Sequence, residues 1–91
     1  MKHVVRTGTY LDDLDQIEHY IARDNARAAA DLWELIDDQV AGLADPLFPR
    51  RRGRVPGTYE LVAHKNYIVI FQETESTITV LNVVHAKKRY P

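Results

Sequence analysis

The chain has 91 residues, which suits one folded domain, and its 45% of apolar residues argues against disorder. It contains no cysteine, which excludes a disulfide framework and a thiolate metal site. The first residues lack the apolar core of a secretion signal, and no stretch is long enough to span a bilayer. We therefore expect a soluble cytoplasmic protein that makes no use of a membrane.

The net charge of −1 conceals an uneven distribution along the chain. Residues 1–45 hold four basic and ten acidic side chains, a net of −6, whereas residues 46–91 hold eight basic and three acidic ones, a net of +5. Such a domain can present opposite fields on two faces, although helices with a solvated acidic surface account for the first half equally well.

The N-terminal half predicts a short strand and then a first helix. Lys2–Arg6 carries two adjacent valines, which favours a strand. Thr9 and Asp12 resemble a capping pair at the start of a helix. One apolar face then follows at Tyr10, Leu14, Ile17 and Ile21.

A second helix is predicted to follow after a short break. Asp24-Asn25 interrupts the first helix and offers a cap for the next, and Gly42 and Pro46 end the second one. Its apolar face is formed by Ala29, Trp33, Ile36, Val40 and Leu43. Two helices joined by so short a break should form an antiparallel hairpin.

The C-terminal half predicts a loop and three strands. Pro46 to Gly57 is rich in proline, glycine and arginine and is read as a loop. Residues 59–64 alternate in polarity, Tyr67–Phe71 is apolar throughout, as in a strand covered on both faces, and Thr77–Val84 is rich in β-branched residues.

These elements give the fold class α+β in the order β-α-α-β-β-β, with a helical hairpin on one face of a small, mainly antiparallel sheet. The predicted core comprises the inward positions of every element: Tyr10, Leu14, Ile17, Ile21, Trp33, Ile36, Val40, Leu61, Val69, Phe71, Val80 and Val84. Trp33 is assigned to this core in preference to a base-stacking surface.

Most catalytic constellations are absent from the sequence. Ser76 is the only serine and falls in a predicted turn, which excludes a serine triad. The four histidines lack metal-ligand spacing, and no glycine-rich phosphate loop occurs, so we expect neither a metal nor a cofactor. The acidic residues of the first helix flank its apolar face and are interpreted as solvated charge.

What remains is a set of basic residues at the borders of the predicted sheet. One group precedes the first hairpin strand and the other follows the last strand: Arg50, Arg51, Arg52 and Arg54, then His85, Lys87, Lys88, Arg89 and Tyr90. Their cations suit phosphate or carboxylate partners, and a terminal tyrosine can stack on a base. A patch that only aids solubility is the alternative, and His85 fits a structural hydrogen-bonding residue as well as a functional one.

The segment Arg52–Pro91, RGRVPGTYELVAHKNYIVIFQETESTITVLNVVHAKKRYP, resembles the C-terminal half of the RelE/ParE toxin superfamily. The pieces GRVPGTYELV, NYIVIFQ and VLNVVHAKKRYP occur in the order and spacing of that superfamily, and the helix LDDLDQIEHYIA with an alanine-rich second helix fits its N-terminal half. The resemblance covers nearly the whole chain and implies the toxin of a type II toxin–antitoxin system, held silent by a cognate antitoxin.

The superfamily implies two possible targets. RelE-like members cut messenger RNA on the ribosome without a metal, and ParE-like members poison DNA gyrase. Many ribosome-dependent members of the superfamily look to carry an arginine directly after the first residue of the central strand, where this chain has Ile68. The segments TYELVAHKNYIV and VVHAKKRYP of this chain are more similar to the ParE-like branch. The resemblance thus implies a gyrase inhibitor that is not an enzyme, with a metal-independent RNase as the alternative and a non-toxic interaction module as a second one.

The resemblance also implies where toxicity resides. Target binding is expected at the basic residues of the two border segments: Arg54, His85, Lys87, Lys88, Arg89 and Tyr90. For an RNase, Arg54, Lys88, Arg89 and Tyr90 would be the catalytic candidates. The antitoxin is expected to wrap the toxin with a helix and an added strand, an acidic tail meeting the basic sheet edge.

Overall fold

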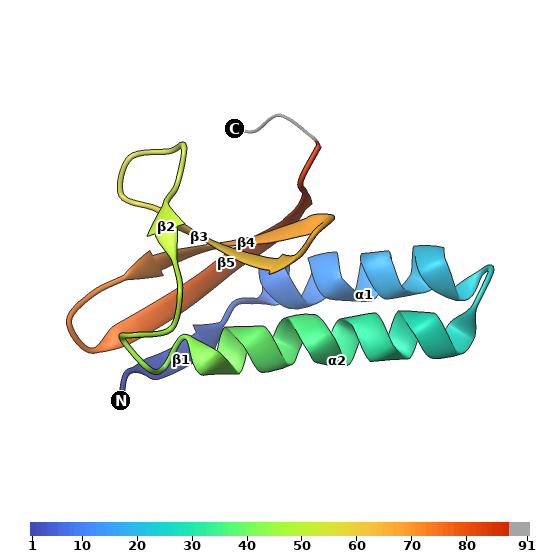
Figure 1. Cartoon of the computed structure of the whole chain (residues 1–91), viewed down its shortest axis with the longest axis horizontal. Helices are drawn as coiled ribbons and strands as arrows, with labels where there is room; N and C mark the ends of the chain where they lie inside the picture. The colour runs from blue at the N-terminus through green and yellow to red at the C-terminus, as the bar shows by residue number, and fades with distance from the viewer. Residues whose placement is uncertain (88–91) are drawn as a thin grey trace.

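The computed structural model describes residues 1–87. In chain order the elements are β1 (His3–Arg6), α1 (Gly8–Ala22), α2 (Ala26–Gly42), β2 (Arg51–Arg52), β3 (Tyr59–His64), β4 (Tyr67–Glu73) and β5 (Thr77–His85). The two helices lie side by side on one face of a single sheet (Figure 1). This arrangement confirms the α+β prediction, to which it adds the two-residue strand β2 inside the segment interpreted as a loop.

The sheet has the strand order β1-β5-β4-β3-β2 within the described chain. β1 pairs with β5 in parallel, and the other neighbours pair antiparallel, as the sequence predicted. No helix of residues 1–87 has the length and apolar character needed to cross a membrane.

Each helix begins at a side-chain cap. Asn25 accepts a hydrogen bond from the N–H of Ala28 at 3.0 Å and caps α2, as predicted. For α1 the predicted pair of Thr9 and Asp12 is wrong, because the chain turns helical at Gly8 and the cap is Thr7. The Thr7 hydroxyl accepts from the Tyr10 N–H at 3.2 Å and donates to the carbonyl of Val80 at 2.7 Å. One side chain therefore starts α1 and also fixes its first turn to β5.

The core lies between the helices and the sheet and contains most of the predicted residues. Buried are Tyr10, Leu14, Ile36, Val40, Leu61, Val69, Phe71 and Val80, while Ile17 and Trp33 are partly buried against them. Ile21 is only partly buried, because the helical hairpin extends past the sheet at that end (Figure 1). The core also takes in Leu43 and Ile78.

Val84 was predicted in the core and is instead partly exposed. Ile70 lies opposite Asn82, but Phe71 lies opposite Val80, so Leu81 is an extra residue in β5. A bulge of this kind reverses the alternation of side chains along the strand. After it, Val83 is buried in place of Val84.

Replacing Thr7 with alanine is expected to lower the free energy of unfolding by about 1–2 kcal/mol, because it removes the α1 cap together with the bond to β5. Urea denaturation monitored by circular dichroism measures this loss. Thr7→Ser, which keeps the hydroxyl, is the control and should stay close to wild type. Equal stability of Thr7→Ala and wild type would contradict the cap.

Candidate functional site at the basic end of the sheet

The arginines that precede β3 differ in their exposure to solvent. Arg51 and Arg52 form β2 and are exposed, and Arg54 is exposed in the bend that follows. Arg51 directs its Nε to the Glu60 Oε1 at 2.9 Å. Arg50 is turned inward, and its side chain is only 11% exposed.

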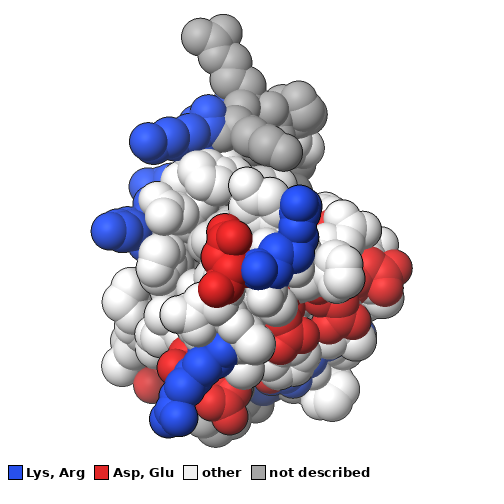
Figure 2. Space-filling model, turned by 90° about the vertical axis from the view of Figure 1, so that its right-hand side faces the viewer, with Lys and Arg blue, Asp and Glu red and all other residues white. Residues whose placement is uncertain are grey.

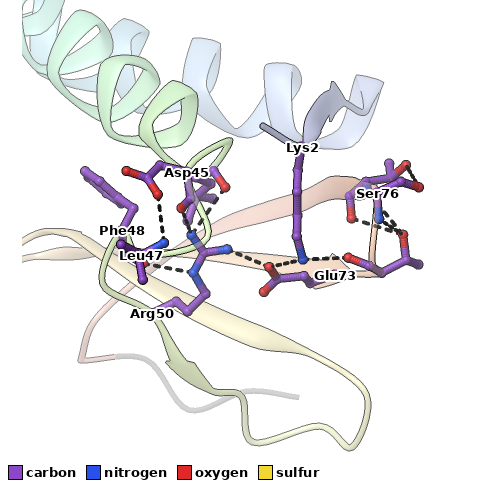
Figure 3. A network of polar contacts seen from close by, with 10 residues as sticks. Lys2, Asp45, Leu47, Phe48, Arg50, Glu73 and Ser76 are labelled. Carbon is purple, nitrogen blue, oxygen red and sulfur yellow. Dashed lines mark hydrogen bonds and ion pairs between the residues drawn. The ribbon is translucent and has the colours of Figure 1, made fainter.

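Arg50 belongs to a structural network that joins three distant segments (Figure 3). Its Nη1 and the Nζ of Lys2 both donate to the Glu73 Oε2, at 2.8 and 2.6 Å. The same guanidinium donates to the carbonyls of Leu43 and Asp45. Arg50 therefore fastens the chain between α2 and β2 to the end of β4.

This network sets the protonation of Glu73. Burial alone would raise the pKa of this carboxyl group, but the hydrogen bonds from Lys2 and Arg50 outweigh it, so the pKa lies below the ordinary value. The ionised form is thus favoured in the folded protein.

A row of three rings crosses the sheet at the end where β5 finishes. Tyr67 lies opposite His64 in β3 and opposite His85 in β5. The ring centroids of Tyr67 and His85 are 5.4 Å apart with their planes at 73°, and those of Tyr67 and His64 are 5.9 Å apart. Because Tyr67 packs against the core cluster, the row faces the helices. His64 and Tyr67 were not predicted as site residues, since only the strand register brings them beside His85.

Both histidines of the row use Nδ1 to accept a backbone hydrogen bond. His85 Nδ1 accepts from the Lys87 N–H at 3.2 Å, and His64 Nδ1 accepts from the Asn66 N–H at 3.1 Å. A neutral imidazole in this position carries its proton on Nε2. The Nε2 N–H groups of the two rings can then donate to an anionic partner.

The remaining predicted site residues fall at the ends of these segments. Lys87 is exposed just after β5, while Lys88, Arg89 and Tyr90 lie outside the described residues. The loop that holds Arg54 and the end of β5 both lie on the side of the sheet away from the helices (Figure 1). The structure thus joins His85 with Tyr67 and His64, and it places Arg54 in a separate loop.

Asp12 and Asp15 are exposed, as predicted for the acids of the first helix, but Asp13 and Asp15 also bind other elements. Asp13 accepts from the N–H of Val83 and from the side chain of Asn82, at 3.0 and 3.1 Å. Asp15 accepts from the Trp33 Nε1 at 3.1 Å. Figure 2 shows acidic side chains in several separate places on this side of the molecule, with a few cations among them.

Asp37 on α2 holds a second cluster next to β1. It receives the Arg6 Nε at 2.8 Å and the Tyr10 hydroxyl at 2.9 Å. Burial, followed by this hydrogen bond, raises the pKa of Tyr10 far above its ordinary value. Tyr10 is therefore a neutral donor at any physiological pH, and the cluster is structural.

Comparison with known proteins identifies the class of protein that carries this fold. The family described as ParE toxin of type II toxin–antitoxin system, parDE, matches residues 4–90. The protein Y4kP of Sinorhizobium fredii is 33% identical over 90 residues, which covers 99% of this chain and 94% of Y4kP. The chain belongs to the family of ParE toxins, and the resemblance seen in the sequence is confirmed.

Solved structures share the fold. The chromosomal ParDE toxin–antitoxin system from P. aeruginosa matches with a TM-score of 0.82 and 23% identity, covering 96% of this chain and 98% of that one. The E. coli DinJ–YafQ complex matches with a TM-score of 0.59 and 11% identity, covering 93% of both chains. The fold is therefore common to these proteins, with the closer agreement to the ParDE system.

Glu73→Gln is expected to destabilise the protein at neutral pH by about 1–3 kcal/mol, because two nearly buried cations lose their shared acceptor. Since the folded-state pKa of Glu73 is depressed, the stabilisation is complete above the ordinary value of 4.5 and disappears as the pH falls through the lower folded value. Urea denaturation across pH 3–7 should show the two stability curves converging at the acidic end. Glu75→Gln, at an exposed acid in the following turn, is the control, and a constant gap at every pH would contradict the network.

Proposed function

We propose that this ParE-family protein inhibits growth by poisoning DNA gyrase and that a cognate antitoxin neutralises it. Family membership across nearly the whole chain supports the toxin class. The antitoxin follows from the ParDE and DinJ–YafQ structures, which are toxin–antitoxin systems by name.

The observation that supports gyrase over RNA cleavage is the place of Ile68 in the central strand β4. Metal-free cleavage of RNA requires a group that withdraws the 2′-hydroxyl proton. The Nδ1 atoms of His64 and His85 accept hydrogen bonds from backbone N–H groups. Ile68, where the resemblance to ribosome-dependent toxins implies arginine, is a buried residue of β4 that is 5% exposed. The exposed cations at this end suit an anionic partner.

RNA cleavage on the ribosome is the second candidate, favoured by the row of His64, Tyr67 and His85 itself. Three polar rings across three strands form an ordered surface on which a nucleotide could stack. This reading requires a group beside the row that withdraws the 2′-hydroxyl proton. A toxin-like module without activity is a third reading, and normal growth on induction of soluble protein would favour it.

Purified protein added to a gyrase supercoiling reaction should inhibit supercoiling. The same preparation added to a ribosome programmed with messenger RNA should leave the transcript intact. Cleaved messenger RNA with unaffected supercoiling would contradict the gyrase proposal and select the RNase reading.

The segment from His85 onward is proposed as the toxic surface. His85 is the last residue of β5, and its ring packs against that of Tyr67. The strand therefore fixes the point at which the following segment begins. Lys87 is exposed there, and Lys88, Arg89 and Tyr90 come directly after it in the sequence. Their cations suit the phosphates of DNA or the carboxylates of a protein surface.

Changing Lys88, Arg89 and Tyr90 together to alanine should abolish growth arrest and leave antitoxin binding intact. Each lost charge-assisted contact is worth roughly 1.5–3 kcal/mol when desolvated, which is enough in sum to remove target binding. Growth after induction without antitoxin measures the effect. The matched control is Tyr20→Ala with Arg23→Ala and Arg27→Ala, which removes the same types of side chain from the exposed far end of the helices. Persistent arrest by the first variant, folded by circular dichroism, would contradict this assignment.

A further inference from the structure

The chain turns directly after β5, at the start of the segment that is proposed to carry toxicity. β5 ends at His85, and Ala86 and Lys87 form the turn. The N–H of Lys87 donates to the Nδ1 of His85 at 3.2 Å. A side-chain acceptor that binds the N–H two residues later is the arrangement of an Asx turn, in which asparagine or aspartate supplies an oxygen. Here the imidazole of His85 takes the place of that oxygen.

A backbone hydrogen bond attaches this turn to the sheet. Tyr67 lies opposite His85 in the register of β4 and β5. One residue further along, the N–H of Ala86 donates to the carbonyl of Asn66 at 2.8 Å. Asn66 belongs to the short connection between β3 and β4. The path of the chain as it leaves the sheet is therefore fixed by two hydrogen bonds, one to Asn66 and one to His85.

The connection between β3 and β4 is closed in the same way. His64 is the last residue of β3, as His85 is of β5, and its Nδ1 accepts from the N–H of Asn66 at 3.1 Å. The bond holds the backbone of Asn66, which is the residue whose carbonyl receives the Ala86 N–H. Two histidines therefore end two strands with the same turn, and one turn supports the other.

Tyr67 restricts the plane of the His85 ring. The two centroids are 5.4 Å apart with the ring planes at 73°, which is an edge contact between aromatic rings. This packing keeps the imidazole in the plane in which its Nδ1 reaches the Lys87 N–H. The backbone of Lys87 is thus held, while its side chain is exposed to solvent. The turn therefore begins the basic segment in one defined direction.

We propose that His85 is a positioning residue for the toxic segment, and that toxicity requires its Nδ1 rather than its Nε2. By holding the N–H of Lys87, the ring sets the direction in which residues 88–90 leave the sheet. A segment that is oriented before binding loses less conformational entropy on meeting its target than a free tail does. The inference rests on the proposed toxic role of this segment and is independent of whether gyrase or the ribosome is the target.

Substitutions of His85 separate the roles of the two ring nitrogens. The Oδ1 of asparagine is as many bonds from Cα as Nδ1 and can accept from the Lys87 N–H, whereas the amide of glutamine lies one bond further, near the place of Nε2. Growth arrest is measured without antitoxin against the amount of soluble toxin in the cell. His85→Asn should arrest growth like wild type, while His85→Gln and His85→Ala should need at least about ten-fold more toxin. His19→Ala, at an exposed histidine of α1, is the matched control and should behave like wild type.

Exchange of the Lys87 amide with water, followed by NMR on the purified proteins, reads the hydrogen bond itself. It should be slow in wild type and His85→Asn and faster in His85→Gln and His85→Ala, with circular dichroism showing that all four are folded. Toxicity of His85→Gln with loss of toxicity in His85→Asn would overturn the inference, because Nε2 would then be the essential atom. Arrest by wild type and folded His85→Ala alike would also overturn it and leave the proposed function standing. A wild type that does not arrest growth would contradict the proposed function and this inference with it.

Discussion

The fold depends on how the backbone N–H and C=O groups at the outer edge of β5 obtain hydrogen-bond partners. β5 pairs with β4 along its length, but β1 accompanies it only from Thr77 to Val80. Beyond that point two side chains of the α1 region replace a strand: the Thr7 hydroxyl donates to the carbonyl of Val80, and the Asp13 carboxylate accepts from the N–H of Val83. An uncovered edge would expose unpaired backbone groups and invite non-native pairing. Because α1 provides these hydrogen bonds, they fix the position of α1 on the sheet. The position of α2, which packs against α1, is then fixed as well.

The same constraint separates the charges of the molecule. Acidic side chains of the helices are held where they meet backbone or arginine, as Asp13 meets β5 and Asp37 meets Arg6. Of the basic run that precedes β3, Arg51, Arg52 and Arg54 are exposed, and only Arg50 is withdrawn into the interior. The cations of this run are therefore available on the surface beside the sheet, while Arg50 serves the structure.

Much of this fold could be predicted from the sequence, because the periods of apolar residues and the Asn25 cap are local signals. The bulge at Leu81 could not, since nothing local marks an extra residue in a β-branched strand, and the core position shifted from Val84 to Val83 with it. The site was predicted only in part. The basic segments are visible in the composition, whereas the row of rings at His85 exists only once the strands are in register.

Amide hydrogen exchange on wild type and Asp13→Ala tests the central claim most directly, because it reads the two halves of the β5 edge separately. We predict that the Val83 amide, protected in wild type, exchanges faster in the variant by at least about ten-fold, as expected for one lost hydrogen bond to a charged acceptor. The β5 amides of residues 77–80 should keep their protection. Unchanged protection at Val83 would contradict the account, since the edge of β5 would then be closed by something other than α1.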